Sequence, residues 1–176
     1  MRILAALLVL LSLPAFADTA SPGEAGRAKA VELALAWVTH HTDYSSLAPV
    51  AYDVLSPEAM AATAHRPDAF ALFSCAERKL HFRADADLDN PLVFSFLVRE
   101  VVRYAQCEHE SSTVKTCERA REPYWAQAKF IRATPGLFAS QGTPMSAAQS
   151  DFFDRVALDV DKLADRACTA AAAQPR

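Results

Sequence analysis

Four segments of the chain show the spacing of apolar residues that is typical of helices. Residues 91–107 (PLVFSFLVREVVRYAQC) are apolar on almost every side, and a helix with this pattern is buried over most of its surface. The other three segments each have a single apolar stripe and cover residues 22–40, 118–133 and 144–170. The pattern predicts a largely helical protein with residues 91–107 as its central, buried helix.

Shorter apolar segments predict a small sheet. Residues 49–55, 70–75 and 79–83 have the composition and alternation of strands, and a three-residue turn joins the last two. A short helix over residues 57–64 separates the first strand from the second. We therefore expect an α+β, predominantly helical fold, in which about three strands pack on the buried central helix and further helices flank this unit at both ends.

Prolines mark the expected helix boundaries. In four dipeptides the first residue offers a side-chain oxygen as N-cap and the proline occupies the first helical position: Ser21-Pro22, Ser56-Pro57, Asn90-Pro91 and Thr143-Pro144. Proline and glycine also break helices, so Pro135 and Gly136 predict a loop over residues 134–142.

Residues 1–17 (MRILAALLVLLSLPAFA) have the features of a secretory signal peptide. Arg2 supplies the positive charge, an apolar run follows, and Ala15-Phe16-Ala17 forms a cleavage site of small residues. Cleavage leaves residues 18–176 as a single mature domain. No later segment has the roughly 20 apolar residues of a membrane-spanning helix. We expect a periplasmic or secreted protein that does not span a membrane.

Composition excludes other classes of protein. The chain has 176 residues, of which 52% are hydrophobic and 22% charged, and these values are typical of a globular domain. Its formal net charge is -3, and no run of Lys or Arg marks a nucleic-acid interface, so no nucleic-acid partner is expected. Only 4 glycines are present, which argues against glycine-rich phosphate-binding loops.

The four cysteines predict two disulfides, because an even number of cysteines in an exported chain is usually oxidised. The central helix is expected to run back along the strands that precede it, which brings Cys107 toward Cys75. We therefore favour the pairs Cys75–Cys107 and Cys117–Cys168. The main alternative is a Cys107–Cys117 bridge, which closes a short loop between two helices.

Three charged residues interrupt the central helix: Arg99, Glu100 and Arg103. Charges are costly in so apolar a helix unless they are paired. The simplest interpretation is that they form its exposed edge, with Glu100 and Arg103 as an ion pair three residues apart.

The same residues also have the frame of a metallopeptidase motif. The sequence from Arg99 to Arg103 (REVVR) resembles HExxH with both histidines replaced by arginine; in HExxH the histidines bind zinc and the glutamate activates water. Eighteen residues separate Arg103 from Glu122, which lies near the start of the next helix, where gluzincins have their third zinc ligand. Residues 37–132 thus resemble small exported zincin-like proteins of uncharacterised function, and the resemblance implies a minimal zincin-like half-domain.

The replaced histidines argue against zinc chemistry. Arginine stays protonated and has no lone pair for a metal, so Arg99 and Arg103 are degenerate ligand positions and Glu122 alone remains. Catalytic zinc generally has three protein ligands. We therefore predict no catalytic residue, no metal and no cofactor, with Glu100 as a vestige of the motif. An ion pair from Glu122 to one of the arginines is expected to replace zinc coordination. The candidate pocket consists of Arg99, Glu100, Arg103, Glu122 and Tyr124.

Other metal sites have less support in the sequence. Residues 85–89 (DADLD) resemble the opening of a calcium loop, but Phe96 stands at position twelve, where a glutamate is required. This segment is better explained as a solvated acidic loop that ends in a helix cap. The histidines do not have the spacing of a zinc site; they are His40, His41, His65, His81 and His109.

Three functions are consistent with these features. The first is a zincin-like pseudoenzyme that binds a peptide or an envelope protein, and the second is a periplasmic inhibitor or immunity-type protein. The third, with the least support, is a hydrolase with an unorthodox site. A cleft bordered by Arg99, Arg103 and Glu122 favours the first, whereas a convex surface with a large exposed apolar patch and no cleft at that position favours the second.

Overall fold

The structure is a computed structural model that describes residues 22–109 and 117–173, so the predicted signal peptide lies outside the described residues. Five helices and a three-stranded mixed sheet make up this part of the chain, which is 67% helical and confirms the predominantly helical α+β class. The elements in chain order are α1 (Pro22–His41), β1 (Ala51–Leu55), α2 (Pro57–Ala64), β2 (Ala71–Ser74), β3 (Lys79–Arg83), α3 (Pro91–His109), α4 (Cys117–Ser140) and α5 (Ala147–Ala172).

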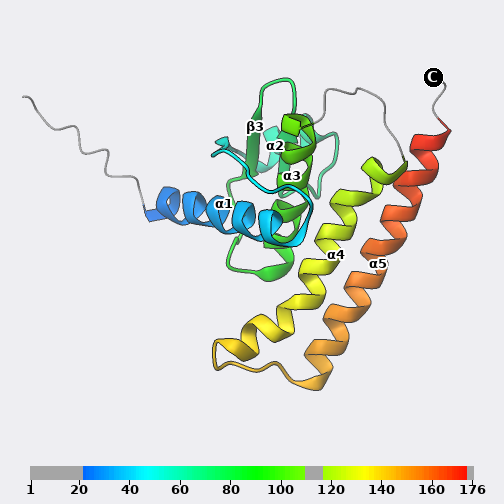
Figure 1. Ribbon diagram of the computed structural model, residues 1–176. Coiled ribbons are helices and arrows are strands. Elements are labelled where there is room, and N and C mark those ends of the chain that lie inside the picture. The colour runs from blue at the N-terminus through cyan, green and yellow to red at the C-terminus, as the bar shows by residue number, and fades with distance from the viewer. Residues whose placement is uncertain (1–21, 110–116, 174–176) are drawn as a thin grey trace, which may run out of the picture.

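The sheet and α3 form the centre of the molecule (Figure 1). The strand order is β1-β3-β2, with β1 parallel and β2 antiparallel to β3, so the predicted β2–β3 hairpin is confirmed. Leu80 and Phe82 of β3 are fully buried in one cluster with Val98 and Val101 of α3. Beside α3, α1 completes this core with Ala34 and other small or branched side chains. The apolar character of α3 is thus explained by neighbours on several sides.

Two of the expected helix starts are confirmed. The Ser56 side chain accepts a hydrogen bond from the N–H of Ala59 at the start of α2. The Asn90 Oδ1 atom accepts one from the N–H of Leu92 at 2.9 Å, at the start of α3. Ser21 lies outside the described residues.

The boundaries between α4 and α5 differ from the prediction. The cap of α5 is Ser146, not Thr143, because Ser146 and Gln149 form a reciprocal capping box. Thr143 instead donates from its N–H and its hydroxyl to the Phe138 carbonyl and closes the end of α4. The predicted loop over 134–142 is also wrong: α4 continues to Ser140. Its packing beside α5 outweighs the local signal of the proline, since tertiary contacts supply most helix stability.

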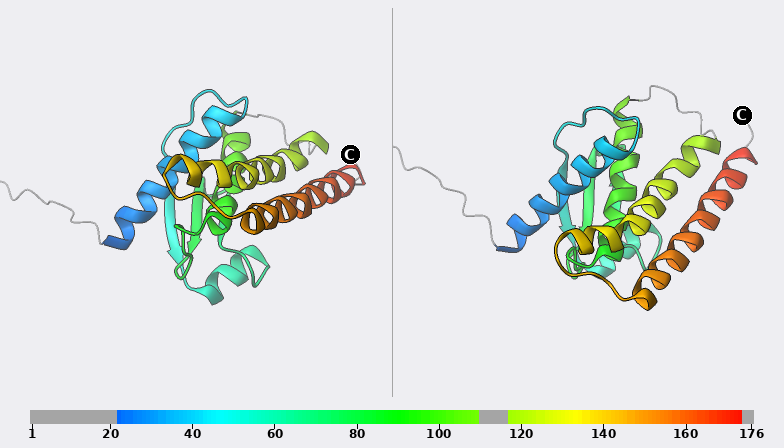
Figure 2. Two further views of the ribbon diagram at one scale, coloured as in Figure 1. Left: turned by 90° about the horizontal axis from the view of Figure 1, so that it is seen from below. Right: turned by 60° about the horizontal axis from the view of Figure 1, so that its bottom comes forward.

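The α4–α5 pair is an antiparallel hairpin that extends away from the sheet (Figures 1 and 2). Its own small core consists of Ala128, Ile131, Phe153, Ala157 and Val160, all buried. The fully buried alanines let the two backbones approach closely. The pairs Arg121–Asp165 and Arg132–Asp161 join the helices at their edge.

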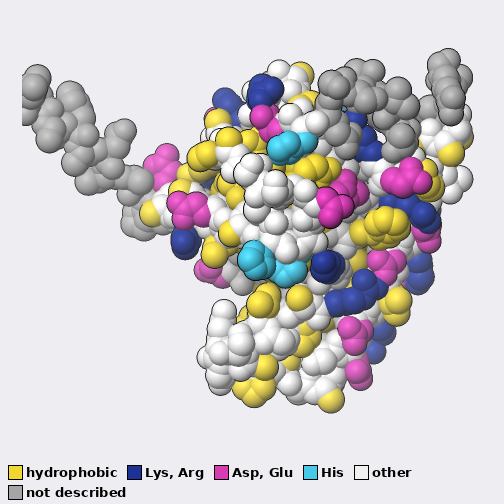
Figure 3. All heavy atoms as spheres, in the orientation of Figure 1, with side chains coloured by type: hydrophobic (Ala, Val, Ile, Leu, Met, Phe, Trp, Pro, Cys, Tyr) yellow, Lys and Arg dark blue, Asp and Glu magenta, His cyan; other side chains and the backbone are white. Residues whose placement is uncertain are grey.

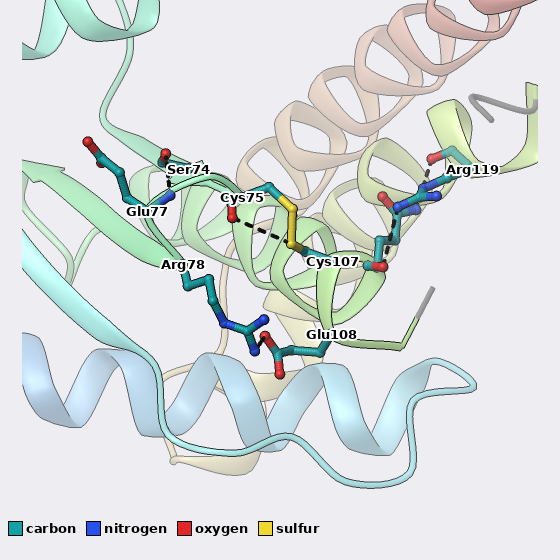
Figure 4. The surroundings of a disulfide bond; sticks show 8 residues. Ser74, Cys75, Glu77, Arg78, Cys107, Glu108 and Arg119 are labelled. Atoms are coloured by element: carbon teal, nitrogen blue, oxygen red, sulfur yellow. Dashed lines mark hydrogen bonds and ion pairs between the residues drawn. A yellow bond between two sulfur atoms is a disulfide. The ribbon is translucent and has the colours of Figure 1, made fainter. Parts of the chain in front are cut away.

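The favoured cysteine pairing is confirmed: Cys75 is bonded to Cys107 and Cys117 to Cys168. Figure 4 shows the first bridge, which ties the end of β2 to the last turns of α3 beside the Arg78–Glu108 ion pair. Two disulfides are typical of proteins that fold outside the reducing cytosol. None of the described helices combines the length and the apolar character that crossing a bilayer requires.

Burial raises the pKa of Tyr104, whose hydroxyl donates to the Ala48 carbonyl at 3.0 Å, and the nearby Glu108 carboxylate acts in the same direction. A raised pKa means that the neutral phenol stabilises the fold below its unfolded-state pKa of about 10, and that this stabilisation is lost as pH rises further. We expect Tyr104→Phe to be about 1 kcal/mol less stable than the parent at pH 7. This difference should shrink above pH 10, as measured by urea unfolding.

A suitable control for this measurement is Tyr52→Phe. The Tyr52 hydroxyl donates to the Glu24 carbonyl at 3.2 Å in an exposed position. A Tyr104→Phe deficit that stays constant from pH 7 to pH 11 would contradict the assignment.

Candidate functional site

Glu100 is fully buried and points from α3 toward the sheet. Its Oε2 accepts a hydrogen bond from the Phe73 backbone N–H of β2 at 3.1 Å and one from Arg103 Nη1 at 3.2 Å. Its Oε1 accepts one from Arg99 Nε at 2.8 Å. The predicted Glu100–Arg103 pair is confirmed, but the exposed helix edge is not, because the side chains of Glu100 and Arg99 are only 0% and 7% exposed.

The position of Phe73 explains why a carboxylate is buried here. Strand β2 is an edge strand that pairs only with β3 in the described sheet. An edge strand leaves N–H groups without a sheet partner, and a buried N–H without an acceptor is costly. Glu100 supplies that acceptor, so it belongs to the framework that attaches α3 to the sheet.

Arg99 is buried between aromatic rings. Its guanidinium carbon lies 4.9 Å from the Phe96 ring centroid and 5.6 Å from that of Tyr124. Phe96 in turn packs on Phe70, and the Arg83 guanidinium lies over the Phe70 ring. Arginine tolerates such a position because its guanidinium is weakly hydrated and stacks on aromatic faces. This stack links β3, α3 and α4 and gives Tyr124 a packing role.

Glu122 lies apart from both arginines. Its Oε2 accepts hydrogen bonds from the Tyr44 hydroxyl and from Gln106 Nε2, each at 2.9 Å. No ion pair joins it to Arg99 or Arg103, so the expected replacement of zinc coordination by such a pair is wrong. Gln106, one turn beyond Arg103 on α3, occupies the place where the arginine was expected.

A proline next to Glu122 explains the role of Gln106. Pro123 lies inside α4 and cannot donate to the carbonyl four residues earlier, which belongs to Arg119. Gln106 Nε2 donates to that carbonyl at 2.9 Å, and Arg119 Nη2 donates to the Gln106 carbonyl at 3.3 Å. The contacts of Gln106 therefore replace a helical hydrogen bond and attach α4 to α3.

Groups that could hold a metal do not gather at this position. Among residues 22–109 and 117–173, no set of three or more His, Cys, Asp or Glu side chains is placed to bind an ion. The histidines have other contacts: His81 is buried with Nε2 at 2.8 Å from Glu77, His65 ends α2, and His109 packs on Tyr44. Residues 85–89 form the expected acidic loop that leads to the Asn90 cap.

Two large hollows lie elsewhere on the molecule. The first, of about 790 Å³, lies between α1, the start of α3 and the second half of α4. The second, of about 690 Å³, lies between the start of α3, the end of α4 and the start of α5. Both are lined by Asp87, Asp89, Pro91 and Phe138, so they lie next to each other, and we call the two hollows together the α1–α5 groove. In Figure 3 the outline of the molecule is notched below α1, above the lower end of the α4–α5 hairpin.

Apolar side chains in the walls of the groove are exposed to solvent. Leu33 on α1, Leu137 on α4 and Phe152 on α5 line it with 51%, 42% and 45% of their surface exposed. None of the five predicted pocket residues lines either hollow. The sequence offered two signals for the groove: Gly23 and Gly26, which are unfavourable inside a helix, and the acidic segment 85–89.

The structure therefore brings Arg99, Glu100, Arg103 and Tyr124 together in one packing cluster, in which Arg99 and Glu100 are buried. It places Glu122 in a separate hydrogen-bonded set, and the two hollows are lined by other residues. The resemblance to zincins stays a prediction from the sequence. Comparison of the chain with protein-family models, with curated proteins and with solved structures found no match.

Proposed function

We propose that this protein is an exported, non-catalytic binding protein that holds a polypeptide segment in the α1–α5 groove. The observation that carries the proposal is the adjacent pair of hollows with exposed apolar walls. Exposed apolar surface of this kind is typical of binding sites, because it costs stability and solubility in a free protein. Export to the periplasm or the medium is supported by the two disulfides and by the predicted signal peptide.

The length of the groove favours a polypeptide over a small ligand. Its α1 wall extends from Gly23 to Trp37, which are 14 residues apart, or about 21 Å along a helix. Both helical walls contribute side chains with helical spacing: Ala30, Leu33 and Trp37 from α1, Thr134 and Leu137 from α4. Grooves between two helices of this kind accept the apolar face of a third helix or an extended peptide.

A binding role is also supported by the state of the charged cluster on α3. Both oxygens of Glu100 accept hydrogen bonds from protein groups and the side chain is fully buried, so the carboxylate does not face a cleft. The pseudoenzyme hypothesis and the inhibitor or immunity hypothesis share a binding function, and the groove supports that shared part.

Site-specific photo-crosslinking tests the proposal. A benzophenone amino acid at Leu33 or Leu137, in the chain exported by its own host, should give the same covalent adduct from both positions. The matched control is Leu158 on α5, which is 54% exposed but does not line either hollow. Because the three sites are similarly exposed, a difference between them reports position in the groove.

Three results would contradict the proposal. The first is the same set of adducts from Leu158 as from the groove positions, and the second is no adduct at any of them. The third is one zinc per chain in protein purified without chelators, since that metal content indicates a metalloenzyme.

A further inference from the structure

The charged side chains common to both hollows are two carboxylates, Asp87 and Asp89. We infer that the polypeptide segment bound in the α1–α5 groove is basic as well as apolar, and that it places a Lys or Arg side chain where the two hollows meet. This inference rests on the proposed function and names the chemistry of its partner.

Asp87 and Asp89 carry charge that the described residues do not neutralise. Neither takes part in an ion pair within residues 22–109 and 117–173. Asp87 Oδ1 accepts the Asp89 N–H at 3.1 Å, and both residues are exposed to solvent. An apolar partner without a cation would desolvate these carboxylates with no compensation, which is costly.

The cations around the groove are paired with a carboxylate or line the first hollow alone. Arg83 pairs with Asp85 at 2.6 Å, and Lys29 pairs with Glu32 at 3.2 Å. Arg27 donates to the Ala84 carbonyl at 3.0 Å and lines only the first hollow. No Lys or Arg lines the second hollow. The potential at the junction is therefore negative, which complements a basic segment.

Gly26 offers a way to block the groove without damaging the fold. It lines the first hollow on α1, and a Cβ atom added to it meets no atom within 4 Å. A Trp side chain at this position thus fills space that the partner needs, while removal of a helical glycine favours the helix. Gly136 on α4 is a matched control, because its added Cβ also meets nothing within 4 Å and it does not line either hollow.

The test uses a phage library of random 12-residue peptides, selected on the disulfide-bonded exported chain. Enriched peptides are then synthesised and their affinities measured by fluorescence polarisation. We expect sequences that combine Leu or Phe with Lys or Arg. Gly26→Trp should weaken their binding by about tenfold or more, the factor that corresponds to about 1.4 kcal/mol. Gly136→Trp should leave affinity within about twofold, and both variants should keep the parent's melting temperature or exceed it.

The contribution of charge is measured with Asp87→Asn/Asp89→Asn. Asparagine keeps the oxygen that accepts the Asp89 N–H, so the loop is retained. We expect about tenfold weaker binding and a smaller dependence of affinity on salt, because the removed interactions are screened by ions.

The possible outcomes separate this inference from the function on which it rests. Enriched peptides that lack Lys and Arg, but lose binding in Gly26→Trp, overturn the basic partner and leave the binding function intact. An unchanged affinity in the double asparagine variant has the same meaning. Peptides that bind Gly26→Trp as tightly as the parent, or no enrichment at all, overturn both.

Discussion

Glu100→Ala should lower the free energy of unfolding by about 3–5 kcal/mol, the usual cost of removing one partner from a buried charge cluster. The substitution leaves the Arg99 guanidinium buried between two rings without its counter-charge. It also removes the acceptor of the Phe73 N–H on edge strand β2. A domain of this size is stable by roughly 5–15 kcal/mol, so the variant should unfold at a much lower denaturant concentration.

Three further variants isolate the cause of that loss. Glu32→Ala removes a carboxylate from an ion pair in which both side chains are exposed. It should change the free energy of unfolding by less than about 0.5 kcal/mol. Arg103→Met should cost about 1 kcal/mol, because the Arg103 side chain is 35% exposed. The double variant Arg99→Met/Glu100→Gln removes both buried charges, keeps an acceptor for the Phe73 N–H and should recover most of the loss.

Guanidinium-induced unfolding of the four variants and the parent gives these values. If Glu100→Ala is as stable as the parent, or more stable, the carboxylate is not part of the framework. Catalytic residues often cost stability, so that result would instead favour Glu100 as a relic of an active site.

The elements that could be predicted from the sequence are those with strong local signals. The helix α2 begins and ends where its cap and composition indicate, and β3 has its predicted bounds. The central helix α3 was evident because few polar residues interrupt its apolar pattern. The end of α4 could not be predicted from the sequence. The helix continues through Pro135 because it packs beside α5, and no local sequence pattern indicates that packing.

The candidate site shows the same limit more clearly. The pairing of Glu100 with Arg103 follows from helical spacing, but its burial depends on Phe73, 27 residues away on an edge strand. The partners of Glu122 are Tyr44 and Gln106, from the segment after α1 and from α3, and neither has a fixed spacing to it. A motif frame fixes which residues share a helix face, whereas the neighbours of that face decide whether it is a site or a core.

Removal of the Cys117–Cys168 bridge should release α5 from the rest of the fold. The bridge ties the first residue of α4 to the last turns of α5 and closes a loop of 51 residues, for which chain entropy predicts about 4 kcal/mol. Without it α5 is held mainly by the small α4–α5 core. In Cys117→Ser/Cys168→Ser we expect amide protection in α5 to fall well below that in α3, measured by native-state hydrogen exchange.

The control is Cys75→Ser/Cys107→Ser, which opens a loop of 32 residues with a similar entropic value of about 4 kcal/mol. Here β2 and α3 remain joined through the main core and the Glu100–Phe73 hydrogen bond, so protection should fall evenly in α3 and α5. Equal losses in both double variants would show that α5 is not a separately opening unit.

Because Phe152 of α5 lines the second hollow, release of α5 in a reduced chain would remove one wall of the α1–α5 groove. The affinity of the basic peptides should then require the oxidised Cys117–Cys168 bridge, which confines binding to oxidising compartments.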